Sequence, residues 1–233
     1  MAQQIGYGYG SEYQLLRFLG HHRKEFEDII SNVIGEGEFL WEDFEYADPT
    51  KVISGDKELT GLSFLERLFP TQYPSIKKEY DNYITKSGWQ SWDAVFRHND
   101  ILYLVEAKAH VDELSSGRGE HGGKSKEKIL RFFREQLPEL QDSITRIWLK
   151  DYYQLANRLA IAALLNKHGI KTRILCIYFV NGYRKRIVEK EVNLNATQED
   201  FEKAIEKELR TLGIERNSVS KILCPPVFVN AEP

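Results

Sequence analysis

The stretch 89–109 constrains the fold of this chain more than any other part of it. Two runs rich in β-branched and aromatic residues flank the segment 98–101, which reads His-Asn-Asp-Ile. Asparagine and aspartate tolerate the left-handed backbone that a tight hairpin turn requires. The stretch therefore predicts two antiparallel strands joined at Asn99-Asp100.

The register of this hairpin follows from the turn. A two-residue turn, or a four-residue loop over 98–101, pairs Val95 with Leu104 and places Asp93 opposite Glu106. A three-residue loop would place Asp93 opposite Val105 instead. Side chains alternate along a strand, so Glu106 and Lys108 project on one face and Asp93 joins them from the neighbouring strand in the first register.

Two carboxylates side by side on a central sheet need a physical reason, because like charges directly opposed across strands destabilise the pairing. A divalent cation is the best reason, since carboxylate oxygens are the ligands that Mg²⁺ or Mn²⁺ prefers. A lysine beside such a pair suits a site that also holds an anionic substrate or a hydroxide. Asp93, Glu106 and Lys108 are therefore the candidate catalytic residues.

The rest of the chain alternates helical and strand patterns, which predicts an α/β fold with helices packed on one mixed sheet. Before the hairpin we expect helices across 11–34 with Ser11 as the N-cap, a strand at 38–47, and a helical insertion at about 50–87. After it we expect helices at 126–148, interrupted at Pro138, and at 151–168, strands at 172–180 and 186–192, a helix at 198–212, and a strand at 219–224.

Composition excludes several classes of protein. The chain has 233 residues, 42% hydrophobic and 29% charged, which is too apolar for a disordered protein. Its net charge of −3 excludes indiscriminate coating of nucleic acid, so such a contact needs a local patch. No apolar run approaches the roughly 20 residues of a membrane span, and no secretory leader is expected. Two separated cysteines, Cys176 and Cys224, indicate reduced core residues in a cytoplasmic protein.

At the residues of the hairpin the sequence resembles the PD-(D/E)XK nuclease superfamily. Asp93 matches the first acid of the motif, although Trp92 precedes it where the motif name has proline. Glu106 and Lys108 match the E-x-K element. The resemblance implies a restriction endonuclease-like core in the order helix, three strands, helix, strand. It covers a motif core at 88–180 within a single domain, 1–233.

Further positions resemble functional residues of the superfamily. Glu12, in the first helix, resembles an additional glutamate that many members carry, and Gln154 lies where several subgroups place a glutamine or a basic residue. Arg158 shares the helix face of Gln154, and His110 follows Lys108 by two positions on the same strand face. The insertion at 50–87 and the elaboration at 181–233 match nothing in the superfamily.

The resemblance implies metal-dependent hydrolysis of a phosphodiester. Asp93, Glu106 and the Ala107 carbonyl would hold Mg²⁺, with Mn²⁺ as a substitute, and Glu12 is a further ligand candidate. Lys108 would orient the attacking water or stabilise the transition state, and Gln154 or Arg158 would contact the phosphate. The expected partner is nucleic acid, DNA ahead of RNA, with no membrane. A homodimer is left open.

Each of these residues also has a plain structural interpretation. The hairpin charges form a salt-bridge cluster on a solvated sheet face, Glu12 favours the helix N-terminus, and Gln154, Asn157 and Arg158 form the wet face of a helix. The basic stretch 118–134 is either a solvated helix start or a loop that closes over a nucleic-acid backbone. Two rival functions follow: a relative that binds nucleic acid without cutting it, and a protein-interaction module with a structural acidic cluster.

Overall fold

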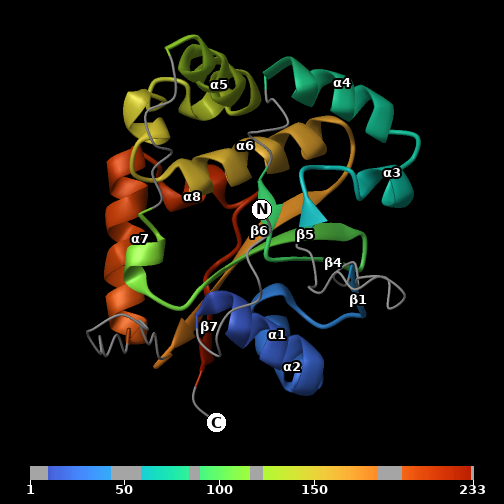
Figure 1. Ribbon diagram of the computed structural model, residues 1–233, viewed down its shortest axis with the longest axis vertical. Coiled ribbons are helices and arrows are strands. Elements are labelled where there is room, and N and C mark those ends of the chain that lie inside the picture. Colours follow the sequence, from blue (N-terminus) through green and yellow to red (C-terminus); the bar gives the residue numbers. More distant parts are fainter. Residues whose placement is uncertain (1–9, 43–58, 84–89, 116–122, 183–195, 232–233) are drawn as a thin grey trace, which may run out of the picture.

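The predicted hairpin forms the middle of the sheet in the computed structural model, which describes residues 10–42, 59–83, 90–115, 123–182 and 196–231 (Figure 1). Its strands are β4 (Ala94–His98) and β5 (Ile101–Lys108). The predicted register is confirmed, since Val95 pairs with Leu104 and His98 with Ile101. Asn99 adopts a positive φ of 55°, the left-handed conformation that the turn needs.

The central sheet has five strands in the order β1-β4-β5-β6-β7. Strand β1 is antiparallel to β4, β4 is antiparallel to β5, and β6 and β7 run parallel to β5. A separate two-stranded sheet joins β2 and β3 just before the hairpin. The remaining strands are β1 (Phe39–Trp41), β2 (Leu59–Thr60), β3 (Ser91–Trp92), β6 (Thr172–Val180) and β7 (Val227–Asn230).

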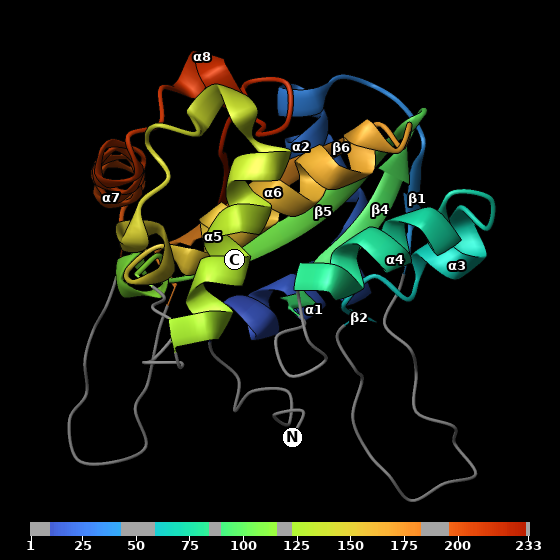
Figure 2. The same ribbon diagram turned by 90° about the horizontal axis from the view of Figure 1, so that it is seen from above.

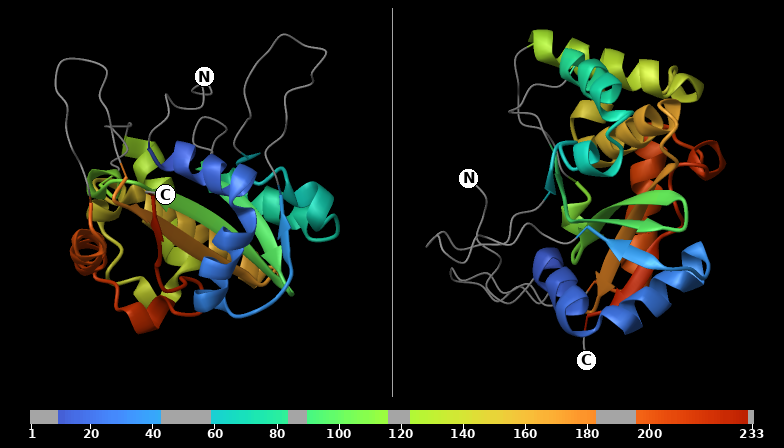
Figure 3. Two further views of the ribbon diagram at one scale, coloured as in Figure 1. Left: turned by 90° about the horizontal axis from the view of Figure 1, so that it is seen from below. Right: turned by 90° about the vertical axis from the view of Figure 1, so that its right-hand side faces the viewer.

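Helices cover both faces of the sheet, and Figures 2 and 3 show these layers. α1 and α2 cover one face, over a core that includes Phe26, Val105 and Ala107. α6 covers the other face, over Leu102 and Leu104, with α5 and α4 outside it. The helices are α1 (Ser11–His21), α2 (Arg23–Ile34), α3 (Leu65–Leu68), α4 (Tyr73–Tyr83), α5 (Gly123–Gln136), α6 (Tyr153–Lys167), α7 (Gln198–Leu212) and α8 (Arg216–Val219).

Helix α6 is the crossover that joins the parallel strands β5 and β6. Most of its residues are buried, so it lies between the sheet and an outer helical layer. At its C-terminal end, the Asn166 side chain donates to Ala162 O (2.7 Å) and Thr172 O (2.8 Å) and accepts from Thr172 N (3.1 Å). These bonds fix the tight connection from α6 into β6.

Several sequence predictions are corrected. Ser11 lies inside α1 and Gly10 occupies the cap position, without a side-chain capping bond. The helical region predicted over 11–34 is two helices that meet at His22. The interruption predicted at Pro138 is confirmed, since α5 ends at Gln136, but the part after it forms 3₁₀ turns at Pro138–Leu140 and Arg146–Leu149 rather than a further α-helix.

The predicted strand at 219–224 is also wrong. Helix α8 occupies its start, and the last strand is β7, which begins after the two prolines at 225–226. The segment between them still joins β6 through one bridge, Ile174 with Leu223. The expected strand at 186–192 lies outside the described residues. No helix in the described ranges has the length and apolarity that crossing a membrane requires.

Candidate active site

Strand β5 presents Glu106 and Lys108 on the face that α6 covers. Leu102 and Leu104 precede them on that face and belong to the core under α6, as alternation along a strand requires. Glu106 is 6% exposed and Lys108 is 9% exposed. A salt-bridge cluster on a solvated sheet face is therefore the wrong interpretation of these charges, because the cluster is buried.

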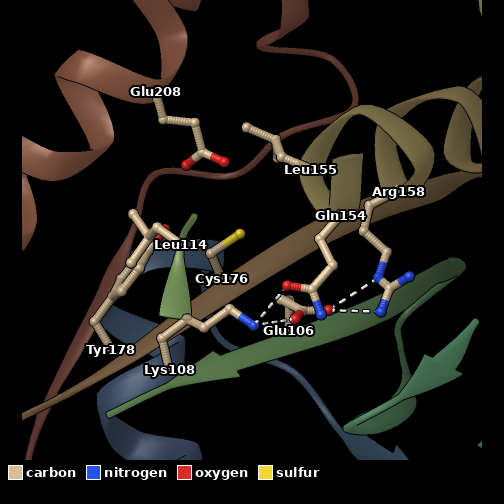
Figure 4. A pocket seen from close by; sticks show the side chains of 9 residues that line it. All are labelled: Glu106, Lys108, Leu114, Gln154, Leu155, Arg158, Cys176, Tyr178 and Glu208. Atoms are coloured by element: carbon tan, nitrogen blue, oxygen red, sulfur yellow. Dashed lines mark hydrogen bonds and ion pairs between the residues drawn. The ribbon is translucent and has the colours of Figure 1, made fainter. Parts of the chain in front are cut away.

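Four side chains form one hydrogen-bonded network (Figure 4). Lys108 Nζ donates to Glu106 Oε1 (2.5 Å) and to Gln154 Oε1 (3.0 Å). Arg158 donates to the other oxygen, Glu106 Oε2, from Nε (2.9 Å), and its Nη2 lies 2.8 Å from the same oxygen. Two cations thus hold a single buried carboxylate, one on each oxygen.

Arg158 also reaches the segment that precedes the hairpin. Its Nη2 donates to Ser91 O (2.7 Å), and its guanidinium lies over the Trp92 ring, 4.6 Å from the ring centroid. Arginine suits this position because its planar fork combines stacking with several fixed donors. One side chain of α6 therefore fixes both β5, through Glu106, and β3.

Asp93 lies in the single-residue gap between β3 and β4, one position beyond the last ladder pair, Ala94 with Val105. Its Oδ2 accepts a hydrogen bond from Ala107 N (2.6 Å). The carboxylate of Asp93 therefore lies against β5 at the residue after Glu106. The two candidate acids and Lys108 come together at the same end of this strand.

The charges in this network stabilise one another. Burial alone would raise the pKa of Glu106, but the positive charges of Arg158 and Lys108 outweigh burial and lower it below its ordinary value. Burial alone would lower the pKa of Lys108, but the negative charges of Glu106 and Asp93 outweigh it and raise that pKa. Both Glu106 and Lys108 are therefore ionised near neutral pH.

A recess opens beside the network and encloses about 340 Å³, including solvent at its mouth. It is lined by Glu106, Lys108, Leu114, Gln154, Leu155, Arg158, Cys176, Tyr178 and Glu208 (Figure 4). Glu208, on α7, is a residue that the sequence analysis missed. Burial raises the pKa of its carboxyl to about 8, so it is mainly neutral at neutral pH. A signal existed, since Glu208 follows the buried Ile205 by three residues on the apolar face of the helix.

The other candidates have different surroundings. Glu12 lies in the first turn of α1, which packs on the sheet face opposite to Glu106. His110 lies past the end of β5 rather than on the strand, and its Nδ1 accepts from Asp112 N (3.1 Å) as the cap of a 3₁₀ turn. Asn157 is fully buried and donates to Tyr153 Oη (2.7 Å). The predicted wet face of this helix is therefore wrong for Asn157 and Arg158.

The basic stretch 118–134 is described only in part. Its first residues lie outside the described part of the chain, as does the charged segment at 183–186. Arg131 is exposed and pairs with Glu135 one turn along α5 (2.6 Å), and Arg134 donates to Ile144 O (2.9 Å). These contacts favour the solvated-helix interpretation for this end of the stretch. The two cysteines are free, as expected.

Comparison of the chain with protein-family models, with curated proteins and with solved structures finds no match.

Proposed function

We propose that this protein is a Mg²⁺-dependent phosphodiesterase that hydrolyses nucleic acid, with DNA ahead of RNA, on a restriction endonuclease-like core of PD-(D/E)XK type. One observation carries the proposal. Asp93, at the start of the hairpin, accepts from Ala107 N between Glu106 and Lys108, and its charge acts on Lys108 at the same end of β5. Gln154 joins Lys108 from the crossover helix.

The order of the elements supports the same proposal. Helices α1 and α2 precede three antiparallel strands, β1, β4 and β5, and the crossover through α6 leads to the parallel strand β6. This order is the one that the resemblance implies. The insertion between β1 and β4 and the elements after β6 are additions to it.

The donor set fits Mg²⁺ in chemical type. Asp93 and Glu106 supply carboxylate oxygens, the ligands that this ion prefers. Glu106 Oε1 has Lys108 as its one partner, so it is the oxygen whose partner an ion could replace. Glu106 Oε2 is committed to Arg158. Asp93, Glu106 through Oε1, and the Ala107 carbonyl are therefore the residues that would hold the ion.

The chain's own side chains then have distinct roles. A bound Mg²⁺ supplies an acidified water and offsets negative charge on the scissile phosphate. Arg158 orients Glu106 through one hydrogen bond from Nε and a close ion-pair contact from Nη2 to the same oxygen, and Gln154 accepts a hydrogen bond from the Lys108 ammonium. Lys108 stabilises negative charge that develops on the phosphate or on the attacking oxygen. The buried surroundings strengthen this interaction by excluding water.

A cleavage assay tests the proposal. Plasmid and single-stranded DNA, and then RNA, are incubated with the protein and Mg²⁺ or with EDTA. We expect metal-dependent cutting that is lost in Lys108→Ala and retained in Lys203→Ala, which removes an exposed lysine of α7 paired with Glu199. Cutting that survives in Lys108→Ala, or in EDTA, would refute the assignment of the site.

A second candidate function is a nucleic-acid-binding protein that does not cut. The observation that favours it is the pairing of both Glu106 oxygens with cations, which gives a charge-balanced cluster without a metal. This function predicts DNA binding that weakens steeply with salt and is unchanged by Mn²⁺. Metal-dependent cutting by the wild type excludes it.

A further inference from the structure

The carboxyl of Glu208 has no role in the proposed reaction, although it lies in the recess beside the candidate active site. Glu208 is 5% exposed, and its carboxyl points into the recess from α7, while Lys108 enters from β5 (Figure 4). Among the described residues no hydrogen bond or ion pair reaches this carboxyl. A carboxyl without a partner in so enclosed a place costs folding free energy. The Lys108 ammonium is directed at Glu106 and Gln154, but it lies close enough to Glu208 to act on its carboxyl by charge attraction.

The charges around the recess define what Glu208 can supply. Asp93 and Glu106 carry two negative charges, and Lys108 and Arg158 carry two positive charges. These four charges cancel while Glu208 is protonated, which is a low-energy arrangement for buried groups. Glu113, on the 3₁₀ turn after β5, adds a further negative charge that acts on Lys108. A divalent cation bound here would add two positive charges to the net charge of the site. The single negative charge of a phosphodiester would offset one of these two charges.

No other group in the described recess provides the missing negative charge. Burial raises the pKa of the Cys176 thiol to about 12 and holds the pKa of Tyr178 well above its usual range, so both stay neutral. Gln154 does not ionise. The ionisable groups around Glu208 come from β5, from β6, and from α6 and the residue before it: Glu106, Lys108, Cys176, Tyr178, Arg158 and Tyr152. Two 3₁₀ turns that also contact α7 carry Asp112, Glu113 and Arg146.

We propose that Glu208 is a positioning residue that receives the Lys108 ammonium when a divalent cation takes its place on Glu106. The inference rests on the proposed metal site and deepens it. Lys108 leaves Glu106 Oε1, crosses the recess and pairs with the Glu208 carboxylate, whose proton passes to solvent. Lys108 then stays charged beside the site, although its original partner is occupied.

Calorimetry of Mn²⁺ binding tests the inference without a substrate. Titrations at about pH 7 in two buffers of different ionisation enthalpy give the number of protons released per ion. We expect about one proton from the wild type, because Glu208 starts mainly protonated and ends ionised. We expect close to none from Glu208→Gln, with Mn²⁺ affinity roughly tenfold lower or more, because the amide cannot ionise.

Three further variants make the result decisive. Glu208→Asp keeps an ionisable carboxyl and should restore the proton release, and Glu206→Gln, an exposed neighbour on α7, should behave like the wild type. Because glutamine mimics the protonated carboxyl, Glu208→Gln should keep the melting temperature of the wild type. Asp93→Ala reports on the metal site itself.

The outcomes separate the two proposals. Mn²⁺ binding that is lost in Asp93→Ala, yet releases no proton and is unchanged in Glu208→Gln, overturns the role of Glu208 and leaves the metal site standing. No Mn²⁺ binding by the wild type overturns the metal site and this assignment with it.

Discussion

Replacing Arg158 by methionine measures how much the buried charge network contributes to the free energy of unfolding. The change keeps much of the side-chain length but removes one hydrogen bond and one further ion-pair contact to Glu106, the hydrogen bond to Ser91 O, and the guanidinium over Trp92. It leaves the buried Glu106 carboxylate with Lys108 as its remaining cation. Breaking a buried ion pair from one side costs about 3–5 kcal/mol. We expect a loss in that range.

Urea unfolding followed by circular dichroism measures this loss, and a double-mutant cycle assigns it. Glu106→Gln combined with Arg158→Met should cost clearly less than the sum of the two single changes, because the charge left unpaired in each single variant is absent. Arg131→Met is the matched control, since Arg131 is exposed and its pair with Glu135 contributes at most about 1 kcal/mol.

The pH dependence has a definite sign. The pKa of Glu106 is lowered in the folded protein, so its stabilising contribution is present above the unfolded pKa and lost as pH falls through the folded one. In Arg158→Met the burial of Glu106 is opposed by Lys108 without the charge of Arg158, so the pKa of this carboxyl rises and acid neutralises the poorly compensated carboxylate more readily than in the wild type. The destabilisation should therefore shrink on acidification. A loss below about 1 kcal/mol at neutral pH would refute the reasoning.

Three further predictions concern single positions. Asp93→Asn should lower the melting temperature in EDTA, because Asp93 holds Lys108 by charge attraction; a higher melting temperature would instead indicate repulsion between carboxylates. Gly37→Ala should cost about 1–3 kcal/mol in urea unfolding, because its Cβ would lie 2.6 Å from the His98 ring; an unchanged midpoint contradicts this close approach. Thr197→Ala should cost about 1 kcal/mol by removing the capping box of α7, whereas Thr197→Ser should cost much less.

The sequence was sufficient to predict the centre of the fold. Turn chemistry at Asn99 set the register, and strict alternation placed Glu106 and Lys108 on the face of Leu104. The apolar run at 174–180 predicted β6, because a parallel strand covered on both faces is apolar along most of its length, and the strand that we expected at 172–180 has its observed ends.

Other parts of the fold and of the site could not be predicted, because they depend on contacts between residues distant in the sequence. The run 219–224 is apolar enough for a strand, but its first residue completes α8, whose turn is closed by Ser218 and Ser220 hydroxyls. Glu208 looks like an ordinary helix glutamate until the packing of α7 beside β6 places it over the recess. Arg158 was a candidate for phosphate, and the fold shows it bound to Glu106 and Ser91 O.

The indole under Arg158 gives this site a built-in optical reporter. Trp92 is one of four tryptophans; it is fully buried, and its Nε1 donates to Gly61 O (2.8 Å), so the ring is held in one orientation. A charge held over an indole shifts the energy of its emission. Any ligand that rearranges the charges around Glu106 should therefore change the tryptophan spectrum, and Trp92→Phe should abolish that change.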